Sequence, residues 1–519
     1  MKKIRNILNL SLLAVVLTTS SCSDFLDVNK DPNRVTGDNI TPDLIFTQAE
    51  NAVGVRQASR FIFMNNWMGY WSRSGTFIVE QEETTYKVAN TFTENNWDQA
   101  YNILFDLYQV KTRALAANDS VLTGASMVLS AKLWQETVDQ FGAVPYSQAF
   151  DYVKYPRPAY DKATDIYADL LTQLDKAISY LDATAPKSSF AKTDIIFARG
   201  IAIKELPTVV AKWKKLANTI KLRIYLRQSE KGFVPTAAQI AKITADGGFF
   251  AAGEDVSVNP GYTNQTDKQN PFYAAFGLTA SGAPATTNNK PNNYFVKTIL
   301  GSTDARLTRL YSNASGKIDG TDYGALGGNK IPNGATITGT EIGPGLAGSS
   351  EQDQFIMPSF ESLFFQAEAT ARGWLPGGDA AAKALFESGI KQSFRWLGVT
   401  TTKTLLTGTA ITDSISDKYI QNVTTANWAN SGTTAADKVK FIAFQKYIAL
   451  CGVDAIESWS DLRRGVLVLP AGYLSNNPVR ATNLPTILPY PQTEITTNKA
   501  NLPERDKDAI FTEKLFWQP

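Results

Sequence analysis

Apolar side chains recur every three or four positions along several stretches of the chain, which is the spacing of one helix face. This pattern predicts helices over 161–181, over 127–141 and over a stretch that ends near Arg227. Gly142 stands where a helix C-cap is expected, and Pro145 follows shortly after it. The first half of the chain is therefore predicted to be helical.

The helical pattern returns in the last third of the chain. It predicts a pair of antiparallel helices over 359–372 and 379–396, a helix that opens at the capping-box residue Thr434, and a shorter helix over 454–464. Small residues are expected to face one another across the pair: Ala367, Ala371, Ala380 and Ala384. Such a pair is similar to a tetratricopeptide-type hairpin. The fold class is therefore mainly α.

The middle of the chain, about 251–355, has a different composition. It is rich in Gly, Asn, Thr, Ser and Pro, which predicts long loops with occasional short strands. Loops of this length in a globular chain are usually functional or disordered. Its glycines form neither the GxxxxGK[ST] nor the GxGxxG pattern of a phosphate-binding loop, so a nucleotide site has little support.

The N-terminus has the pattern of a bacterial lipoprotein. Three basic residues precede an apolar run over 7–17, and small residues then lead directly to Cys22. The run is too short to span a bilayer, which favours a removed signal over a transmembrane helix. The pattern predicts a signal peptide over 1–21, a lipidated Cys22 with a flexible tether over 22–39, and a single α-rich domain over 40–519. The alternative is a secreted protein with a chance cysteine.

Composition excludes several classes of function. The 51 Lys and Arg residues nearly balance the 49 Asp and Glu residues, which argues against a nucleic-acid partner. The chain has no histidine, so Ser-His-Asp or Cys-His nucleophiles and imidazole metal sites are excluded. Cys451 lies in an apolar run and is expected to be a small buried hydrophobe. Aromatic residues are plentiful, which suits core packing and sugar stacking alike.

The densest aromatic and amide cluster lies over 65–73. A glycan site needs a flat aromatic face and nearby groups that bond hydroxyls, and this segment offers both. The candidate ligand-binding residues are Asn66, Trp67, Tyr70, Trp71 and Arg73. The same rings stand at helical spacing, so burial in the core is the alternative.

A second candidate cluster lies in the loop-rich middle of the chain. Asn270, Tyr273 and Tyr294 are its candidate ligand-binding residues, with Tyr262 and Tyr323 as weaker members. Aromatic residues on long loops are well placed to bind ligands, because loops carry variable function on a rigid scaffold. The alternative is that the neighbouring Phe272 and Phe276 merely pin the loop to the core.

The acidic clusters do not predict catalysis. Asp454, Glu457 and Asp461 could line one helix face, but capping, the helix dipole and pairing with Arg463 and Arg464 explain them better. The acidic run Glu80, Glu82 and Glu83 is expected to be solvated. No catalytic residue, resident metal or cofactor is predicted, although calcium could bind in the Asp- and Asn-rich loops, where no EF-hand spacing occurs.

Several segments, in order along nearly the whole chain, resemble the SusD/RagB family of outer-membrane nutrient-binding lipoproteins, closest to the SusD-like 2 branch. The segments are Ser21–Asp27, Asp139–Tyr146, Lys212–Asn218, Asp304–Arg306, Gln445–Gly452, Glu457–Gly465 and Leu488–Glu494. Each segment alone is weakly specific, and the resemblance rests on their occurrence together in this order. It implies a SusD-like fold with tetratricopeptide-like helix pairs and long loop-rich insertions.

The resemblance also implies a function and a partner. Members are binding proteins and not enzymes, anchored by lipid in the outer membrane at the cell surface. They bind oligosaccharides and deliver them to a TonB-dependent, SusC-like transporter. Peptides are an alternative cargo. A surface glycoside hydrolase is a less favoured alternative, because it would need two carboxylates across a cleft and no pair stands out in the sequence.

Overall fold

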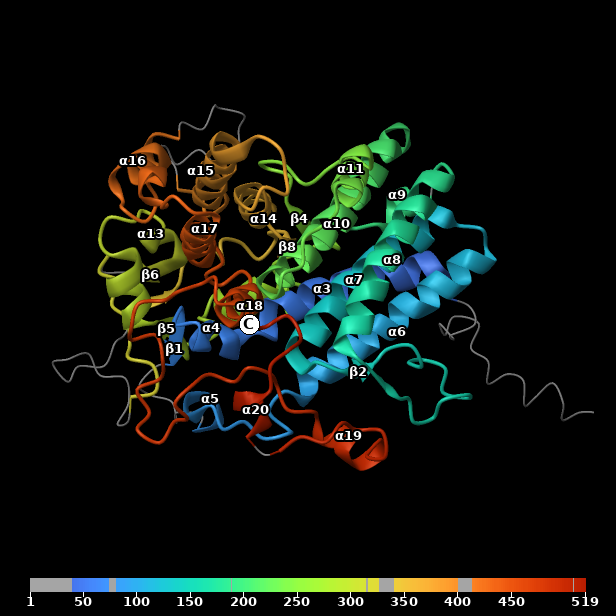
Figure 1. Cartoon of the computed structure of the whole chain (residues 1–519), viewed down its shortest axis with the longest axis horizontal. Coiled ribbons are helices and arrows are strands. Elements are labelled where there is room, and N and C mark those ends of the chain that lie inside the picture. The colour runs from blue at the N-terminus through green and yellow to red at the C-terminus, as the bar shows by residue number, and fades with distance from the viewer. Residues whose placement is uncertain are drawn as a thin grey trace, which may run out of the picture.

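The computed structural model describes residues 40–73, 81–187, 189–313, 316–325, 340–399, 413–506 and 508–519. The predicted signal peptide, Cys22 and the tether lie outside these residues. Most of the described residues are helical, as the sequence predicts, and the strands are short (Figure 1). None of the described helices combines the length and the apolar run that a membrane span requires.

Long helices from the first half of the chain form one side of the molecule (Figure 1). They are α3 (Pro42–Ser59), α6 (Glu94–Ala116), α7 (Ser120–Phe141), α8 (Ala163–Ala183), α10 (Leu206–Arg227) and α11 (Ala237–Ala245). Helix α7 is buried on nearly every face and packs against both α6 and α8. Gly124 permits the close approach to α8, because a Cβ there would lie 2.7 Å from the Ala177 carbonyl oxygen. The predicted C-cap is confirmed, with Gly142 at a φ of 77°.

Helices from the last third form the opposite side. They are α14 (Ser359–Ala371), α15 (Gly378–Trp396), α16 (Ser414–Asn422), α17 (Ala435–Ala449) and α18 (Ala455–Arg464). The α14–α15 hairpin and the Thr434 capping box are confirmed. The predicted facing residues are partly wrong, since Ala380 and Ala384 are exposed. Ala382 and Gly389 are buried instead, and Gly389 lets the Phe364 ring of α14 approach closely.

Short elements complete the fold. The strands form four antiparallel pairs: β1 (Trp71–Arg73) with β5 (Asn289–Pro291), β2 (Val144–Pro145) with β3 (Tyr160–Asp161), β4 (Val256–Val258) with β8 (Gln354–Met357), and β6 (Tyr311–Asn313) with β7 (Thr340–Ile342). The short helices are α4 (Ile62–Trp67), α5 (Gln81–Thr85), α9 (Phe190–Thr193), α12 (Pro271–Phe276), α13 (Leu307–Leu310), α19 (Gln492–Thr497) and α20 (Ala509–Thr512). Single turns lie at Ile203–Glu205, Ser229–Lys231, Tyr294–Leu300 and Trp428–Asn430.

The loop-rich middle contains more structure than its composition predicts. Besides the expected short strands, it holds α12 and the π-helical turn Tyr294–Leu300. The N-terminus of α12 has a recognisable signal, because Asn270 caps it and Pro271 occupies its first turn. Its brevity hides the helical period, so the sequence alone did not reveal it.

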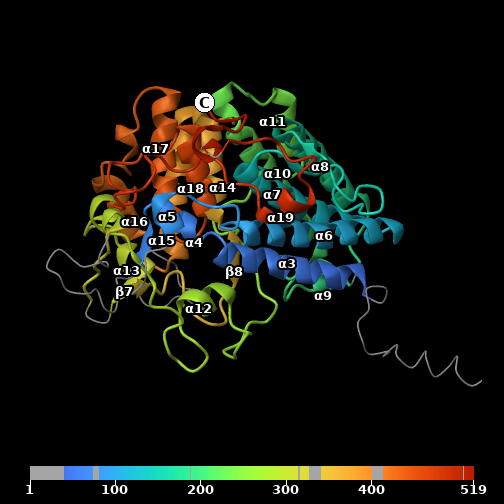
Figure 2. The same ribbon diagram turned by 90° about the horizontal axis from the view of Figure 1, so that it is seen from below.

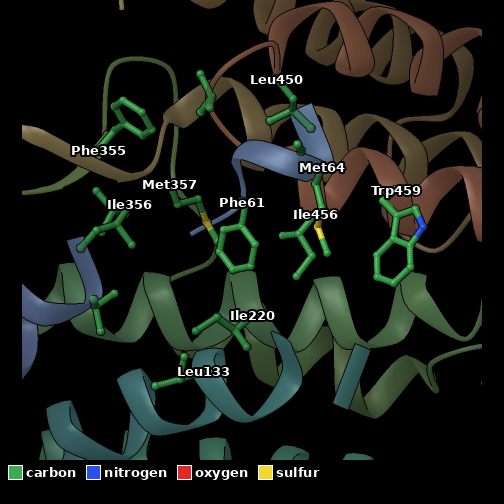
Figure 3. Close-up of a cluster of buried hydrophobic side chains, with 14 of the residues drawn as sticks. Phe61, Met64, Leu133, Ile220, Phe355, Ile356, Met357, Leu450, Ile456 and Trp459 are labelled. Atoms are coloured by element: carbon green, nitrogen blue, oxygen red, sulfur yellow. The ribbon is translucent and has the colours of Figure 1, made fainter. Parts of the chain in front are cut away.

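A large hydrophobic core runs through both helical sides, and a small separate cluster of Leu222, Leu226, Phe365 and Ala369 lies between α10 and α14. Figure 3 shows Leu133 and Ile220 of α7 and α10 below Ile356, Met357 and the α18 residues Ile456 and Trp459. The same core cluster includes residues of α3, α6, α8, α14, α15 and α17. Cys451 is fully buried within it, as predicted, and burial raises the pKa of its thiol to about 12.

Charged side chains cross this core on α18. Glu457 pairs with Arg227 of α10 and Lys446 of α17, and Asp461 pairs with Lys446 and with Arg464 on its own helix. Asp454 caps the helix through the Glu457 amide. The predicted cap and the predicted pairing with Arg464 are confirmed, but Arg463 donates to the Asp139 and Thr486 carbonyls and not to these acids. Their complete burial was not predicted, because their partners come from other helices.

Candidate functional site

The aromatic residues of the first predicted cluster lie in the core. Trp67 and Tyr70 are 0% exposed and Trp71 is 1% exposed. The Trp67 indole donates to the Glu83 carbonyl, and the Tyr70 hydroxyl donates to the Tyr447 carbonyl at 2.7 Å. Trp71 packs on the Phe276 ring, with centroids 5.0 Å apart. None of these rings has a face open to a sugar. They are core residues, which was the alternative to a binding role, and they cannot stack on a sugar in this structure.

The polar members of that cluster gather around Glu83. Asn66 is fully buried and donates to Oε1 of Glu83 at 2.5 Å, while Arg73 Nη2 lies 2.7 Å from Oε2. Arg73 Nη1 also donates to Asn289 of β5. The prediction of a solvated acidic run is therefore wrong for Glu83, which is 1% exposed, and Glu80 lies outside the described residues.

The second cluster packs against the first. The Asn270 side chain is buried, accepts from the Tyr273 amide and donates to the Gln352 carbonyl, so it organises the loop. Tyr294 is 6% exposed, and its hydroxyl donates to the Pro470 carbonyl. Tyr273 is half-buried. Trp71 contacts both Phe272 and Phe276, and β1 pairs with β5 just before Tyr294, which joins the two clusters.

The eight predicted residues thus converge, yet only Arg73 and Tyr273 keep substantial exposed surface. The weaker candidate Tyr323 is buried as well, and its hydroxyl donates to the Glu83 carbonyl. The described residues contain no group of three or more acidic or thiol side chains that could hold a metal ion. Calcium binding therefore stays a prediction.

A different part of the surface has the features that the glycan hypothesis requires. We call it the aromatic groove. It has a volume of about 460 Å³ and lies between α6, the segment 145–158 and α19. Its lining residues are Trp97, Asp98, Tyr101, Asn102, Phe105, Pro145, Ala149, Phe150, Tyr152, Tyr155, Pro156, Pro158 and Glu494. Figure 2 shows α6 and α19 close together on this side of the molecule.

One face of α6 provides the floor of the groove. Trp97, Tyr101 and Phe105 follow one another at intervals of four residues and therefore lie on the same side of the helix. The Trp97 and Tyr101 rings stack with centroids 4.8 Å apart. The Tyr101 hydroxyl donates to the Pro145 carbonyl at 2.7 Å, which fastens the opposite wall to the floor.

The opposite wall is the segment 145–158, whose base is held by short contacts. β2 and β3 pair across it, and the Asp161 carboxylate accepts from the backbone amides of Tyr146 and Ser147 and from the Ser147 hydroxyl. Beyond this base the segment projects into solvent. Tyr152 is 63% exposed and packs on Phe105, with ring centroids 5.7 Å apart.

Polar groups stand at the mouth of the groove. Asp98 and Asn102 are exposed on α6, and Glu494 of α19 accepts from the Tyr160 hydroxyl at 2.6 Å. Partial burial, and then the negative charges of Glu94 and Glu494, raise the pKa of Asp98 above its ordinary value. These groups can accept or donate hydrogen bonds beside a stacked ring.

The sequence reasoning missed this groove. Its signal was present, since three aromatic residues recur every four positions on an amphipathic helix and a second aromatic group follows over 150–155. Such a stripe is indistinguishable from a core-facing stripe unless the packing of the opposite segment is known.

Comparison with known proteins places the chain in a family. Residues 32–491 match the SusD-like 2 family model, described as starch-binding and associating with the outer membrane. No curated protein matches the chain.

Several solved structures share the fold. A SusD/RagB family protein from Bacteroides thetaiotaomicron has 18% sequence identity and a TM-score of 0.69, and the match covers 92% of this chain and 99% of that one. A SusD homologue from Bacteroides fragilis has 19% identity and a TM-score of 0.66, with 89% and 94% covered. A chitin-binding SusD homologue from Flavobacterium johnsoniae has 21% identity and a TM-score of 0.66, with 92% and 97% covered. At these identities the likeness shows the fold alone. Because the family model spans most of the chain, this protein belongs to the SusD-like 2 family of outer-membrane nutrient-binding proteins.

Proposed function

We propose that this protein is a lipid-anchored protein of the cell surface that captures oligosaccharides and delivers them to a TonB-dependent, SusC-like transporter. Family membership supports nutrient binding at the outer membrane. The sequence before Cys22 supports the anchor, because a cationic start, a short apolar run and small residues precede that cysteine. Acyl chains on Cys22 would then hold the folded part on the membrane surface.

The observation that carries the oligosaccharide cargo is the aromatic groove. Tyr152 and Tyr155 present rings along one wall, and Asp98, Asn102 and Glu494 provide hydrogen-bonding groups within the same groove. A pyranose ring has an apolar face for stacking and a rim of hydroxyls that both donate and accept. A concave site with aromatic walls and a few polar groups matches this chemistry.

The mechanism is binding without a chemical step. Most hydrogen bonds to sugar hydroxyls replace bonds to water, so each contributes only about 0.5–1.5 kcal/mol. Stacking on two rings with a few such bonds predicts dissociation constants of about micromolar to millimolar. Weak binding suits a protein that must pass its cargo on to a transporter.

Isothermal titration calorimetry of the chain from Ser23 onward tests this proposal. The probes are malto- and chito-oligosaccharides, other plant, host and microbial glycans, and a peptide digest. Heat with one glycan class that falls in Tyr152→Ala and Tyr155→Ala, but not in Tyr273→Ala, supports the groove. If the binding heat is lost only in Tyr273→Ala, the binding site is the cluster predicted from the sequence and not the groove. Heat with the digest only would replace the glycan with a peptide cargo.

One observation favours hydrolysis as a second candidate function. Two carboxylates, Asp98 and Glu494, both line the groove, and glycoside hydrolysis uses such a pair. Incubation with each bound glycan should release no new reducing ends if the protein only binds. Release that disappears in Asp98→Asn would establish the enzyme instead.

A further inference from the structure

A second cavity adjoins the aromatic groove. We call it the inner pocket. It has a volume of about 230 Å³, is open to solvent and is bounded by α6, α7, α8 and the segment 146–150. Its lining residues are Leu104, Leu107, Tyr108, Lys111, Met127, Ser130, Ala131, Trp134, Tyr146, Ser147, Ala149, Phe150, Asp169, Leu170 and Gln173.

Phe150 separates the inner pocket from the groove. Its ring lies 5.8 Å from that of Phe105 on the groove side and 5.6 Å from that of Tyr108 on the pocket side, between centroids. Of the residues that the structure describes, Ala149 and Phe150 line both cavities. The two cavities are therefore neighbours at the surface. They are separated by Phe150 and by the contact between Tyr101 on the groove side and Trp134 on the pocket side, whose ring centroids are 5.5 Å apart.

The backbone at Phe150 is strained. Its φ is 74°, a left-handed conformation that bulky side chains rarely adopt. Such a conformation persists only where the surroundings hold it, and it is concentrated at functional sites. Here the surroundings are the aromatic rings on both sides of the wall together with the Asp161 contacts at the base of the segment. This left-handed backbone conformation places the Phe150 ring between the two cavities.

The inner pocket has the mixed chemistry of a sugar site. Trp134 and Tyr108 supply aromatic surface, and Lys111, Asp169 and Gln173 supply polar groups. The Asp169 carboxylate already accepts from the Tyr146 hydroxyl and from Gln173. The Lys111 amine lies over the Tyr108 ring and is attracted by the charge of Asp169, so a sugar hydroxyl could accept from the amine and donate to the carboxylate.

We propose that the inner pocket is a second sugar subsite, which takes the terminal residue of an oligosaccharide whose preceding residues lie in the aromatic groove. Donor and acceptor groups on opposite helices suit hydroxyls, which do both. The pocket is half the volume of the groove, so it accepts a single ring where the groove accepts a short chain. This inference rests on the proposed function. It adds that the protein prefers oligosaccharides of a certain length and that the inner pocket recognises their terminal residue.

The test compares binding along a length series. Malto- and chito-oligosaccharides from the disaccharide to the heptasaccharide are titrated into the chain from Ser23 onward and into three variants. Lys111→Met removes the amine, and Ser130→Leu fills the pocket from α7. Lys176→Met is the matched control, because it removes a neighbouring amine that does not line the pocket.

The wild-type protein should gain about tenfold in affinity when the chain becomes long enough to reach the inner pocket, which corresponds to one or two hydrogen bonds. Lys111→Met and Ser130→Leu should lose that step and bind shorter chains as before, and Lys176→Met should keep it. An unchanged length dependence in both pocket variants, with binding still weakened by Tyr152→Ala, would overturn the second subsite and leave the proposed function standing. If neither the malto- nor the chito-oligosaccharides produce heat with the wild-type protein, the proposed function is overturned for these glycans, and the second subsite with it.

Discussion

Two aromatic clusters of similar composition serve different purposes in this protein. The cluster of α4 and β1 contains Trp67, Tyr70 and Trp71, and all three rings are enclosed. The aromatic groove is also lined by tryptophan and tyrosine beside amide and acidic groups, yet Tyr152 is mostly exposed there. Density of aromatic and polar residues therefore does not distinguish a core from a binding site.

The direction of the polar contacts makes the difference. In the α4–β1 cluster the Tyr70 hydroxyl bonds the Tyr447 carbonyl and the Tyr447 hydroxyl bonds the Met68 carbonyl, so both polar ends are used inside the protein. In the groove, Asp98 and Asn102 remain exposed. The α4–β1 cluster thus keeps its polar groups inside the protein, where Trp71 Nε1 and Asn66 Oδ1 have no hydrogen-bond partner among the described residues. The groove instead leaves polar groups exposed at a concave surface, where they can bind a ligand.

The largest expected effect is a loss of stability in the enclosed cluster. Trp71→Ala should lower the free energy of unfolding by about 3–5 kcal/mol, because it removes a fully buried ring and leaves a cavity. Urea denaturation of the chain from Ser23 onward measures this. Tyr152→Ala is the control and should change stability by no more than about 0.5 kcal/mol. Equal losses in both variants would contradict the distinction between the two clusters.

The next effect concerns the buried carboxylate beneath the enclosed cluster. Glu83→Gln should cost about 1.5–3 kcal/mol of stability, because it removes the negative charge that Asn66 and Arg73 bond in a buried setting. The matched control is Glu82→Gln, which alters a partly exposed acid on the same short helix. If both substitutions proved neutral, the interpretation of Glu83 as the organising group would be wrong.

A third effect separates buried from exposed acids by their response to pH. Burial is the main cause that raises the pKa of Asp454 from 3.8 to about 6. The folded state then binds more protons than the unfolded state between these values, so this group makes stability fall as pH rises from 4 to 6. Asp454→Asn should remove that part of the pH dependence. Asp98→Asn in the groove should have a smaller effect, since solvent screens an exposed charge. Identical stability profiles of wild type and Asp454→Asn over this range would refute the assignment.

The smallest effect is the one most specific to function. Tyr152→Ala should weaken binding of an oligosaccharide by about 0.5–1.5 kcal/mol, a factor of roughly two to ten, through the loss of one stacking ring. Calorimetry measures the change directly. Tyr273→Ala should have no such effect, and a reversal of the two results would exchange the roles of the two surfaces.

The sequence predicted the helical frame well because long helices repeat their apolar positions many times. Helices α7, α8, α10 and the α14–α15 hairpin all follow from that period. Short elements such as α12 carry too few repeats to be recognised. The order of family segments identified the fold, and the family model agrees with it.

The site was harder to predict because burial depends on partners distant in sequence. Glu83 looks like part of a solvated acidic run until the fold brings it beneath Asn66 and Tyr323. Glu457 likewise looks like a surface residue until Arg227 reaches it from a helix 230 positions earlier. The groove shows the reverse, since the stripe of aromatic residues on α6 resembles a core face until the segment 145–158 is seen to leave it open.

A crystal structure of the chain from Ser23 onward with its tightest-binding oligosaccharide would show whether the aromatic groove holds the ligand. We expect sugar rings against Tyr152 and Tyr155, with Asp98, Asn102 or Glu494 bonding their hydroxyls, while Trp67, Tyr70 and Trp71 stay enclosed. Sugar bound beside Arg73 and Tyr273, with the aromatic groove empty, would contradict this expectation.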